Sequence, residues 1–232
     1  MLTAPDPARG SRAPLFFYFD FASPHAYLAW CEIHSLAARH LRVVVPVPVR
    51  LTWLRQASGQ RPLVEIGARQ RYLLKHALRL AHEMGRLLVV PAGSSPEAPP
   101  EVPPEVPLDL ALALTLASLE LPGPDAQALR KILIDRLFAV AWAGAGRGRS
   151  RSELRRLLDE LGLPAARLLA QAADRGARLR AQTEQAAADG VFDVPTVRVD
   201  GEVFFGVESL PHVERFLSGR DPLALEPLGT SP

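Results

Sequence analysis

The stretch that decides the fold runs from Leu15 to Leu28 and reads LFFYFDFASPHAYL. Its first five residues are bulky and apolar, which predicts a short buried strand. Residues 20–23 then turn the chain, and Pro24 suits the first turn of a helix that continues through Ala38. Ser23 therefore stands at a strand-to-helix junction, beside the unpaired backbone N–H groups of a helix start.

Two compatible roles are open for Ser23. Its hydroxyl can simply cap the helix, as serine often does. The partial positive charge of a helix start also favours an anion, and the hydroxyl can donate a hydrogen bond to a bound thiolate. In thioredoxin-like proteins this junction carries Cys-x-x-Cys, whereas residues 23–26 here read Ser-Pro-His-Ala. Because both sulfurs are missing, we do not expect a disulfide oxidoreductase.

The composition excludes several classes of protein. A chain of 232 residues with 48% hydrophobic content can bury a sizeable core. It has no apolar run of about eighteen residues, so no membrane partner is expected. The net charge is only +2 and the basic residues are dispersed, so no nucleic-acid partner is expected either. The single cysteine, Cys31, fits a reducing compartment and is expected to be a small buried apolar residue.

The predicted elements follow the order strand, helix, strand, then helices, then strand, strand, helix. After the first helix we expect a strand over 41–49, a loop over 50–62, helices over 65–85, 108–121, 125–142, 150–162 and 164–189, strands over 191–200 and 202–205, and a helix over 208–217. This order predicts an α/β, thioredoxin-like domain, formed by residues 15–62 and 190–218 and split by an all-helical insertion over 63–189. Residues 1–14 and 219–232 are expected to be tails.

The insertion contains a proline-rich connector and two histidines, and we do not expect a binding or metal site at either. The proline-rich connector over 91–107 is interpreted as a low-complexity insertion in preference to a recruitment motif. His76 and His82 lie on the 65–85 helix, but no cysteine or carboxylate completes a metal site at a suitable spacing. We therefore expect both histidines to be surface or satisfied core residues, and no metal site.

A second group of candidate residues lies near the carboxyl end. In the thioredoxin arrangement the bond before Pro195 is cis and faces the strand-to-helix junction, which is expected to leave the Val194 N–H and C=O free for an extended peptide. At the next helix start, backbone N–H groups near Ser209 can hold a carboxylate, while Glu208 can accept from an ammonium group. Plain capping is the alternative for these residues. Together with Ser23, they favour glutathione, a tripeptide with a γ-glutamyl end.

These stretches resemble a known family. Residues 17–24 and 190–196 are similar to the opening and closing motifs of the 2-hydroxychromene-2-carboxylate isomerase family, and residues 200–206 follow in the expected place. This family is related to kappa-class glutathione transferases and to DsbA-type oxidoreductases, so the resemblance implies a DsbA-like thioredoxin fold. It covers roughly residues 15–217.

The resemblance implies a cytoplasmic enzyme, often a homodimer, that uses glutathione as a cofactor. Ser23 matches the catalytic serine, which donates to the glutathione thiolate. The thiolate would add to a chromene carboxylate, a small aromatic electrophile, and allow rotation to the trans-benzylidenepyruvate isomer. The glutathione contacts that we expect are Ser23, Gln60, Arg61, Val194, Pro195, Glu208 and Ser209.

The sequence departs from the family pattern at several site positions. His25 stands where the family usually has tyrosine, and Gln60 stands where asparagine is common. Glu208-Ser209 replaces an Asp-Arg pair, and Asp109-Leu110 replaces an Asn-Thr pair near the substrate pocket. Two alternatives therefore stay open: a kappa-like glutathione transferase acting on another electrophile, and a non-catalytic DsbA-like module that binds thiols or peptides.

Overall fold

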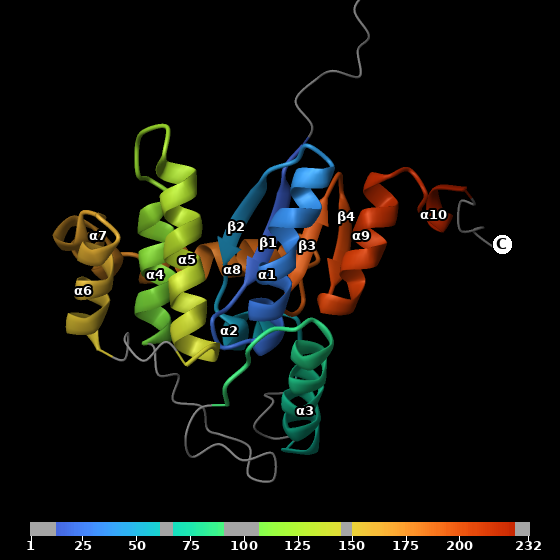
Figure 1. Ribbon diagram of the computed structural model, residues 1–232, viewed down its shortest axis with the longest axis horizontal. Helices are drawn as coiled ribbons and strands as arrows, with labels where there is room; N and C mark the ends of the chain where they lie inside the picture. The colour runs from blue at the N-terminus through green and yellow to red at the C-terminus, as the bar shows by residue number, and fades with distance from the viewer. Residues whose placement is uncertain (1–12, 61–66, 91–106, 145–149, 226–232) are drawn as a thin grey trace, which may run out of the picture.

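The computed structural model describes residues 13–60, 67–90, 107–144 and 150–225. Within these ranges the strands form one four-stranded sheet in the order β2-β1-β3-β4 (Figure 1). The strands are β1 (Leu15–Phe19), β2 (Val44–Pro48), β3 (Thr196–Val199) and β4 (Glu202–Phe205). β1 pairs in parallel with β2 and antiparallel with β3, and β3 pairs antiparallel with β4. The first and last thirds of the chain therefore meet in the middle of the sheet.

Helix α1 (Pro24–Arg39) begins directly after β1 and covers one face of the sheet, beside α9 (Leu210–Leu217). Its start has the predicted signals, because Pro24 occupies the first turn and the Ser23 hydroxyl accepts a hydrogen bond from the Ala26 N–H at 3.1 Å. Helix α8 (Gly176–Ala188) crosses behind the opposite face (Figure 1). The sheet is thus covered by helices on both faces.

The remaining helices lie mostly between β2 and β3 in the sequence. They are α2 (Leu51–Ala57), α3 (Gly67–Glu83), α4 (Leu108–Ser118), α5 (Ala126–Trp142), α6 (Arg151–Glu160) and α7 (Ala165–Ala173), with α10 (Pro222–Leu225) near the carboxyl end. Helices α4 to α7 stand together on one side of the sheet, while α3 lies apart from them (Figure 1). Helix α6 is capped in the same way as α1, since the Ser150 hydroxyl accepts from the Glu153 N–H at 3.2 Å.

One aromatic cluster joins the sheet to the helical insertion. Phe19 and Phe21 pack against Phe138 of α5, with ring centroids 5.5 and 4.8 Å apart. The Trp142 indole N–H donates to the Phe21 carbonyl oxygen at 2.8 Å in a buried contact. Each fully buried aromatic side chain contributes about 1.5–3 kcal/mol. The insertion and the sheet therefore share one hydrophobic core around the end of β1.

Three predicted elements differ from the structure. The loop expected over 50–62 contains α2, because burial of Leu51 and Leu54 stabilises a short helix there. The single helix expected over 164–189 is broken between α7 and α8, and this break lets both segments bury an apolar face. The strand expected over 191–200 begins only at Thr196, since the chain first passes through the cis Val194–Pro195 bond.

The structure also differs from the prediction near the carboxyl end of the chain. The carboxyl-terminal tail expected from residue 219 contains α10, and the expected final helix starts as a 3-10 turn, η3 (Val207–Ser209), before α9. Arg61, residues 1–12 and most of the proline-rich connector lie outside the described residues. Across the described helices, none is both long and apolar enough to cross a membrane.

Candidate functional site

A cavity of about 350 Å³ lies at the junction between β1 and α1. This volume falls at the lower end of the range for small-molecule sites, roughly 300–1,000 Å³. Several segments that are far apart in the sequence supply its walls, and four of them carry the candidate residues. They are the start of α1 (Ser23, Pro24, His25), the segment before β3 (Asp193, Val194, Pro195), helix α3 (Arg69, Tyr72, Leu73, His76) and the end of β4 with η3 (Phe205, Gly206, Glu208).

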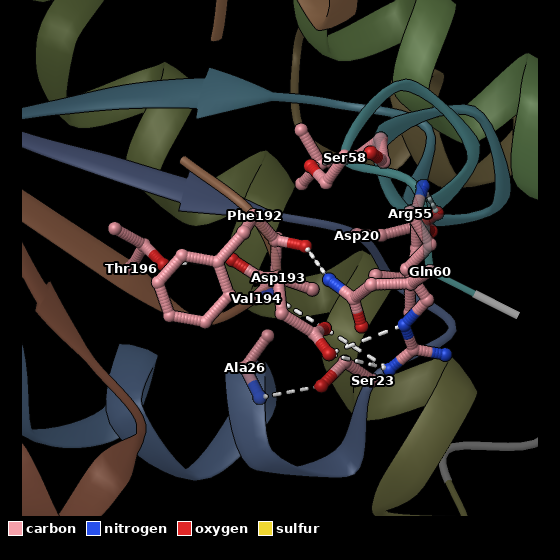
Figure 2. Close-up of polar contacts among 12 residues, drawn as sticks. Asp20, Ser23, Ala26, Arg55, Ser58, Gln60, Phe192, Asp193, Val194 and Thr196 are labelled. Atoms are coloured by element: carbon pink, nitrogen blue, oxygen red, sulfur yellow. Dashed lines mark hydrogen bonds and ion pairs between the residues drawn. The ribbon is translucent and has the colours of Figure 1, made fainter. Parts of the chain in front are cut away.

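Ser23 lines this cavity although only 6% of its surface is exposed. Figure 2 shows the hydrogen bond that its hydroxyl oxygen accepts from the Ala26 N–H. The hydroxyl proton has no acceptor among the described residues, so it is free to donate into the cavity. The two roles considered for Ser23, helix cap and donor to an anion, are therefore both compatible with one geometry.

Val194 and Pro195 line the same cavity, and the peptide bond between them is cis. The expectation that the Val194 N–H is free for a peptide ligand is wrong. This N–H donates to the Asp193 Oδ1 at 2.8 Å, because the Asp193 side chain folds back along its own backbone. The segment therefore offers the cavity its apolar side chains and not that backbone donor.

A buried ion pair holds this segment in place (Figure 2). Arg55 of α2 donates through Nη2 to Asp193 Oδ1 at 3.0 Å and through Nε to Oδ2 at 3.2 Å. Such bidentate, charge-assisted pairs fix geometry as well as adding energy. Thr196 donates through its hydroxyl to the Asp193 carbonyl oxygen at 2.7 Å. The turn opposite Ser23 is thus fixed from two sides.

Two of the predicted contacts do not line the cavity. The Gln60 side-chain amide donates to the Phe192 carbonyl oxygen at 2.6 Å, so this residue supports the neighbouring backbone (Figure 2). The Ser209 hydroxyl donates to the Gly206 carbonyl oxygen at 2.7 Å and closes the turn before α9. Arg61 lies outside the described residues.

Glu208 lines the cavity, but its partner is a histidine of the protein. Glu208 Oε1 lies 3.1 Å from His76 Nε2, and His76 Nδ1 lies 3.3 Å from His25 Nε2. The Tyr72 ring stacks on the His76 ring, with centroids 5.6 Å apart and planes inclined by 14°. Burial lowers the pKa of His25, and the nearby His76 lowers it further. The cavity therefore holds a chain of one carboxylate and two imidazoles.

His76 lines the cavity, although the sequence predicts only a surface or core residue at this position. It lies 51 positions from His25 in the sequence, so no local motif links the two. A usable signal exists on α3 itself, where Arg69, Tyr72 and His76 follow one another at intervals of three and four. Residues so spaced share one helix face, and this face lines the cavity.

The region behind the cavity contains a buried carboxyl group. Asp20 is fully buried, and its carboxylate accepts from the Ala22 N–H at 3.0 Å and from the Leu51 N–H at 2.8 Å. Burial raises the pKa of Asp20, although Arg50 opposes this effect. Asp109 pairs with the same Arg50 at 2.9 Å and lines a separate cavity of about 270 Å³. Asp109 is therefore not a wall of the cavity that contains Ser23.

Among the described side chains, no group of three or more histidine, cysteine, aspartate or glutamate residues is placed to hold a metal ion. The cavity instead combines a helix start, a hydroxyl donor, an imidazole pair and a cis proline. Such a combination suits a small anionic or thiol ligand.

The sheet order, the cis proline facing the start of α1 and the helices inserted between β2 and β3 define a thioredoxin fold with a helical insertion. The sequence matches the DSBA-like thioredoxin domain family over residues 15–218, and the chain belongs to this family. The expected fold class is thereby confirmed.

Known relatives agree with this assignment. The chain is 29% identical over 207 residues to the 2-hydroxychromene-2-carboxylate isomerase of Sphingobium xenophagum, which covers 87% of this chain and 96% of the relative. A solved 2-hydroxychromene-2-carboxylate isomerase superposes with a TM-score of 0.69 at 23% identity, covering 88% of this chain and 94% of the other. The cytosolic disulfide reductase DsbM of Pseudomonas aeruginosa, solved with GSH, superposes with a TM-score of 0.58 at 20% identity, covering 89% and 98%.

Proposed function

We propose that this protein is a glutathione-dependent isomerase of the 2-hydroxychromene-2-carboxylate isomerase type. One observation carries the proposal: at the position where thioredoxin-like proteins have a reactive cysteine, the Ser23 hydroxyl lines a cavity at a helix start, with no acceptor for its proton among the described residues. Such a position stabilises a thiolate that a ligand brings in. The similarity to the isomerase of Sphingobium xenophagum supports the reaction type.

The residues present fit glutathione. The cavity is large enough for part of a tripeptide, and Gly206, whose φ of 89° favours glycine, lines its edge. Ser23 would hold the sulfur, and Val194 with Pro195 would line the peptide. Arg69, whose side chain is 43% exposed at the cavity, would meet a carboxylate. The DsbM structure with GSH shows that a protein of this fold accommodates this ligand.

Bound glutathione supplies a thiolate nucleophile that can add reversibly to a conjugated double bond. The role of this chain is to position and stabilise that charge. The Ser23 hydroxyl donates to the anion, and the unpaired N–H groups at the start of α1 contribute partial positive charge. The buried Arg55–Asp193 pair keeps the opposite wall rigid, so that the ligand stays in a fixed position relative to the Ser23 hydroxyl.

Disulfide chemistry is not part of the proposal. Cys31 is the single cysteine of the chain and lies within α1, eight residues after Ser23. Burial raises the pKa of its thiol, which disfavours the thiolate needed for exchange. A second cysteine for an internal dithiol is missing from the sequence.

A glutathione transferase acting on another electrophile is the second candidate. It is favoured by His25, which stands where the family usually has tyrosine and contacts His76 in the cavity. The exposed ring of Tyr72 in the same cavity also favours it. A non-catalytic thiol-binding module is the third reading. The transferase and the module would both use this cavity, but neither would catalyse the isomerisation.

Isothermal titration with glutathione, followed by a turnover assay with 2-hydroxychromene-2-carboxylate, tests the proposal. We expect binding and isomerisation that stops when glutathione is withheld. Binding without isomerisation, together with conjugation of a general electrophile, would favour the transferase. Failure to bind glutathione at millimolar concentration would exclude both enzymes and favour the non-catalytic module.

A further inference from the structure

The start of α1 stabilises an anion, but it does not remove a proton. The Ser23 hydroxyl donates a hydrogen bond, and a serine hydroxyl is too weak a base at neutral pH to take the proton of a thiol. A thiol that enters the cavity protonated therefore needs a nearby acceptor. The imidazole of His25 lines the same cavity, two residues after Ser23.

The contacts of the two imidazoles indicate which nitrogen of His25 is available. A carboxylate attracts the proton of a neighbouring imidazole, so the ion-pair contact of Glu208 at 3.1 Å favours a His76 proton on Nε2. His76 Nδ1 is then an acceptor, and the contact at 3.3 Å places the proton of His25 on its Nε2. This arrangement leaves His25 Nδ1 with a free lone pair, and no described residue donates to it.

The groups around His25 support a neutral imidazole that can become charged. Burial and His76 of α3 disfavour the imidazolium, while Glu208 of η3 and Asp193 favour it. Arg55 and Arg69 offset much of the Asp193 charge. Tyr72 stacks on His76 and holds its ring plane. Glu208 is therefore the negative group connected to His25 through His76, by an ion-pair contact with His76 and the hydrogen bond between the two imidazoles.

We propose that His25, His76 and Glu208 form a proton relay in which His25 Nδ1 takes the proton of a thiol ligand held at Ser23. The inference rests on the proposed function, with glutathione as the thiol. The S–H bond breaks, its electron pair stays on sulfur, and the proton bonds to His25 Nδ1. The resulting positive charge is shared with His76 and stabilised by the Glu208 carboxylate. The step needs no oxidant or reductant, and it is reversed when the thiol leaves.

The titration of bound glutathione in the full-length protein tests the relay. Its thiolate is followed by far-ultraviolet absorbance as a function of pH in the wild type and in H25F, H76F and E208Q. We expect H25F to raise the apparent pKa of the bound thiol by about one unit, a tenfold loss of thiolate at lower pH. E208Q should shift it in the same direction by less. H82F, at an exposed position of the same helix α3, should leave it unchanged.

A structural role for the histidines gives a different result. If His25 and His76 only connect α1 to α3, H25F lowers the melting temperature and leaves the thiol titration unchanged, which would overturn the relay alone. Absence of glutathione binding by the wild type would overturn the proposed function together with the relay.

Nitrogen-15 NMR of the ligand-free protein adds a readout that does not depend on turnover. We expect the Nε2–H tautomer at both His25 and His76, and loss of this preference in E208Q. Because the Glu208 side chain is half exposed, E208Q should fold normally. A proton on His25 Nδ1 in the wild type would contradict the relay.

Discussion

The two long walls of the cavity differ in burial. The wall formed by the start of α1 and the segment before β3 is the more buried one, since Ser23 is 6% and Asp193 3% exposed. The opposite wall, on α3, contains Tyr72, which is 59% exposed. Buried residues with fixed partners hold a reactive group in one geometry, whereas exposed side chains can vary at little cost in stability. We therefore expect the buried wall to hold the sulfur of a ligand, and the exposed part of the α3 wall, at Tyr72, to contact the substrate.

The largest expected effect comes from breaking the ion pair of the buried wall. In R55M the Asp193 carboxylate keeps the Val194 N–H and a distant Arg69, 4.0 Å away, as its partners. Leaving a buried charge without its main partner costs about 3 kcal/mol. Urea unfolding should show this loss, and R69M, on the exposed wall, should change stability by less than about 0.5 kcal/mol. Equal losses in the two variants would contradict the contrast between the walls.

The second-largest expected effect comes from removing the Ser23 hydroxyl from the buried wall. S23A should lower turnover by about a hundredfold, because the donor acts on charge that the reaction uses. Glutathione affinity, measured by calorimetry, should fall much less. The lost helix cap also costs about 1 kcal/mol of stability.

S150A provides the matched control for this variant. Ser150 caps α6 through the same type of hydrogen bond, away from the residues that line the cavity. We expect a similar loss of stability in S150A and unchanged turnover. If S23A and S150A lost the same fraction of activity, Ser23 would be a cap only.

His34, on the helix α1 that begins in the buried wall, should make the stability of the fold sensitive to acid. Burial, assisted by Lys131, lowers the pKa of His34 on α1 from 6.5 to about 4. Between these two pH values the unfolded chain binds a proton that the folded chain does not, so stability falls as the pH decreases. The part-buried ring should contribute on the order of 2 kcal/mol of this loss.

Urea unfolding at several pH values checks this expectation. H34F removes the titrating group and should flatten the decline between pH 6.5 and 4. H82F changes an exposed histidine and should retain the wild-type slope. An unchanged slope in H34F would show that other groups cause the acid sensitivity.

The smallest expected effect on stability comes from the exposed wall. Y72A removes an exposed ring that stacks on His76, and the free energy of unfolding should change by at most about 0.5 kcal/mol. The KM for an aromatic substrate should rise while glutathione affinity stays the same. Y72F keeps the ring and should behave like the wild type. A large loss of stability in Y72A would remove the distinction between the two walls.

The sequence alone determined the elements whose signals are local. The apolar run over 15–19 followed by Ser23 and Pro24 predicted both β1 and the start of α1, because strand burial and helix capping depend on neighbouring residues. The order of strands and helices predicted the fold class, since few topologies connect such an order.

Tertiary structure alone decided the contacts between remote segments. Helix α2 forms where a loop was expected, because packing of Leu54 and the Arg55–Asp193 pair stabilise it. The chain from Glu208 through His76 to His25 joins three elements that only the fold brings together. Local propensity acts over a few residues, whereas such contacts depend on how the whole core packs. The amino-acid order therefore specified the serine at the start of α1, and the folded arrangement brought the two imidazoles into the cavity that it lines.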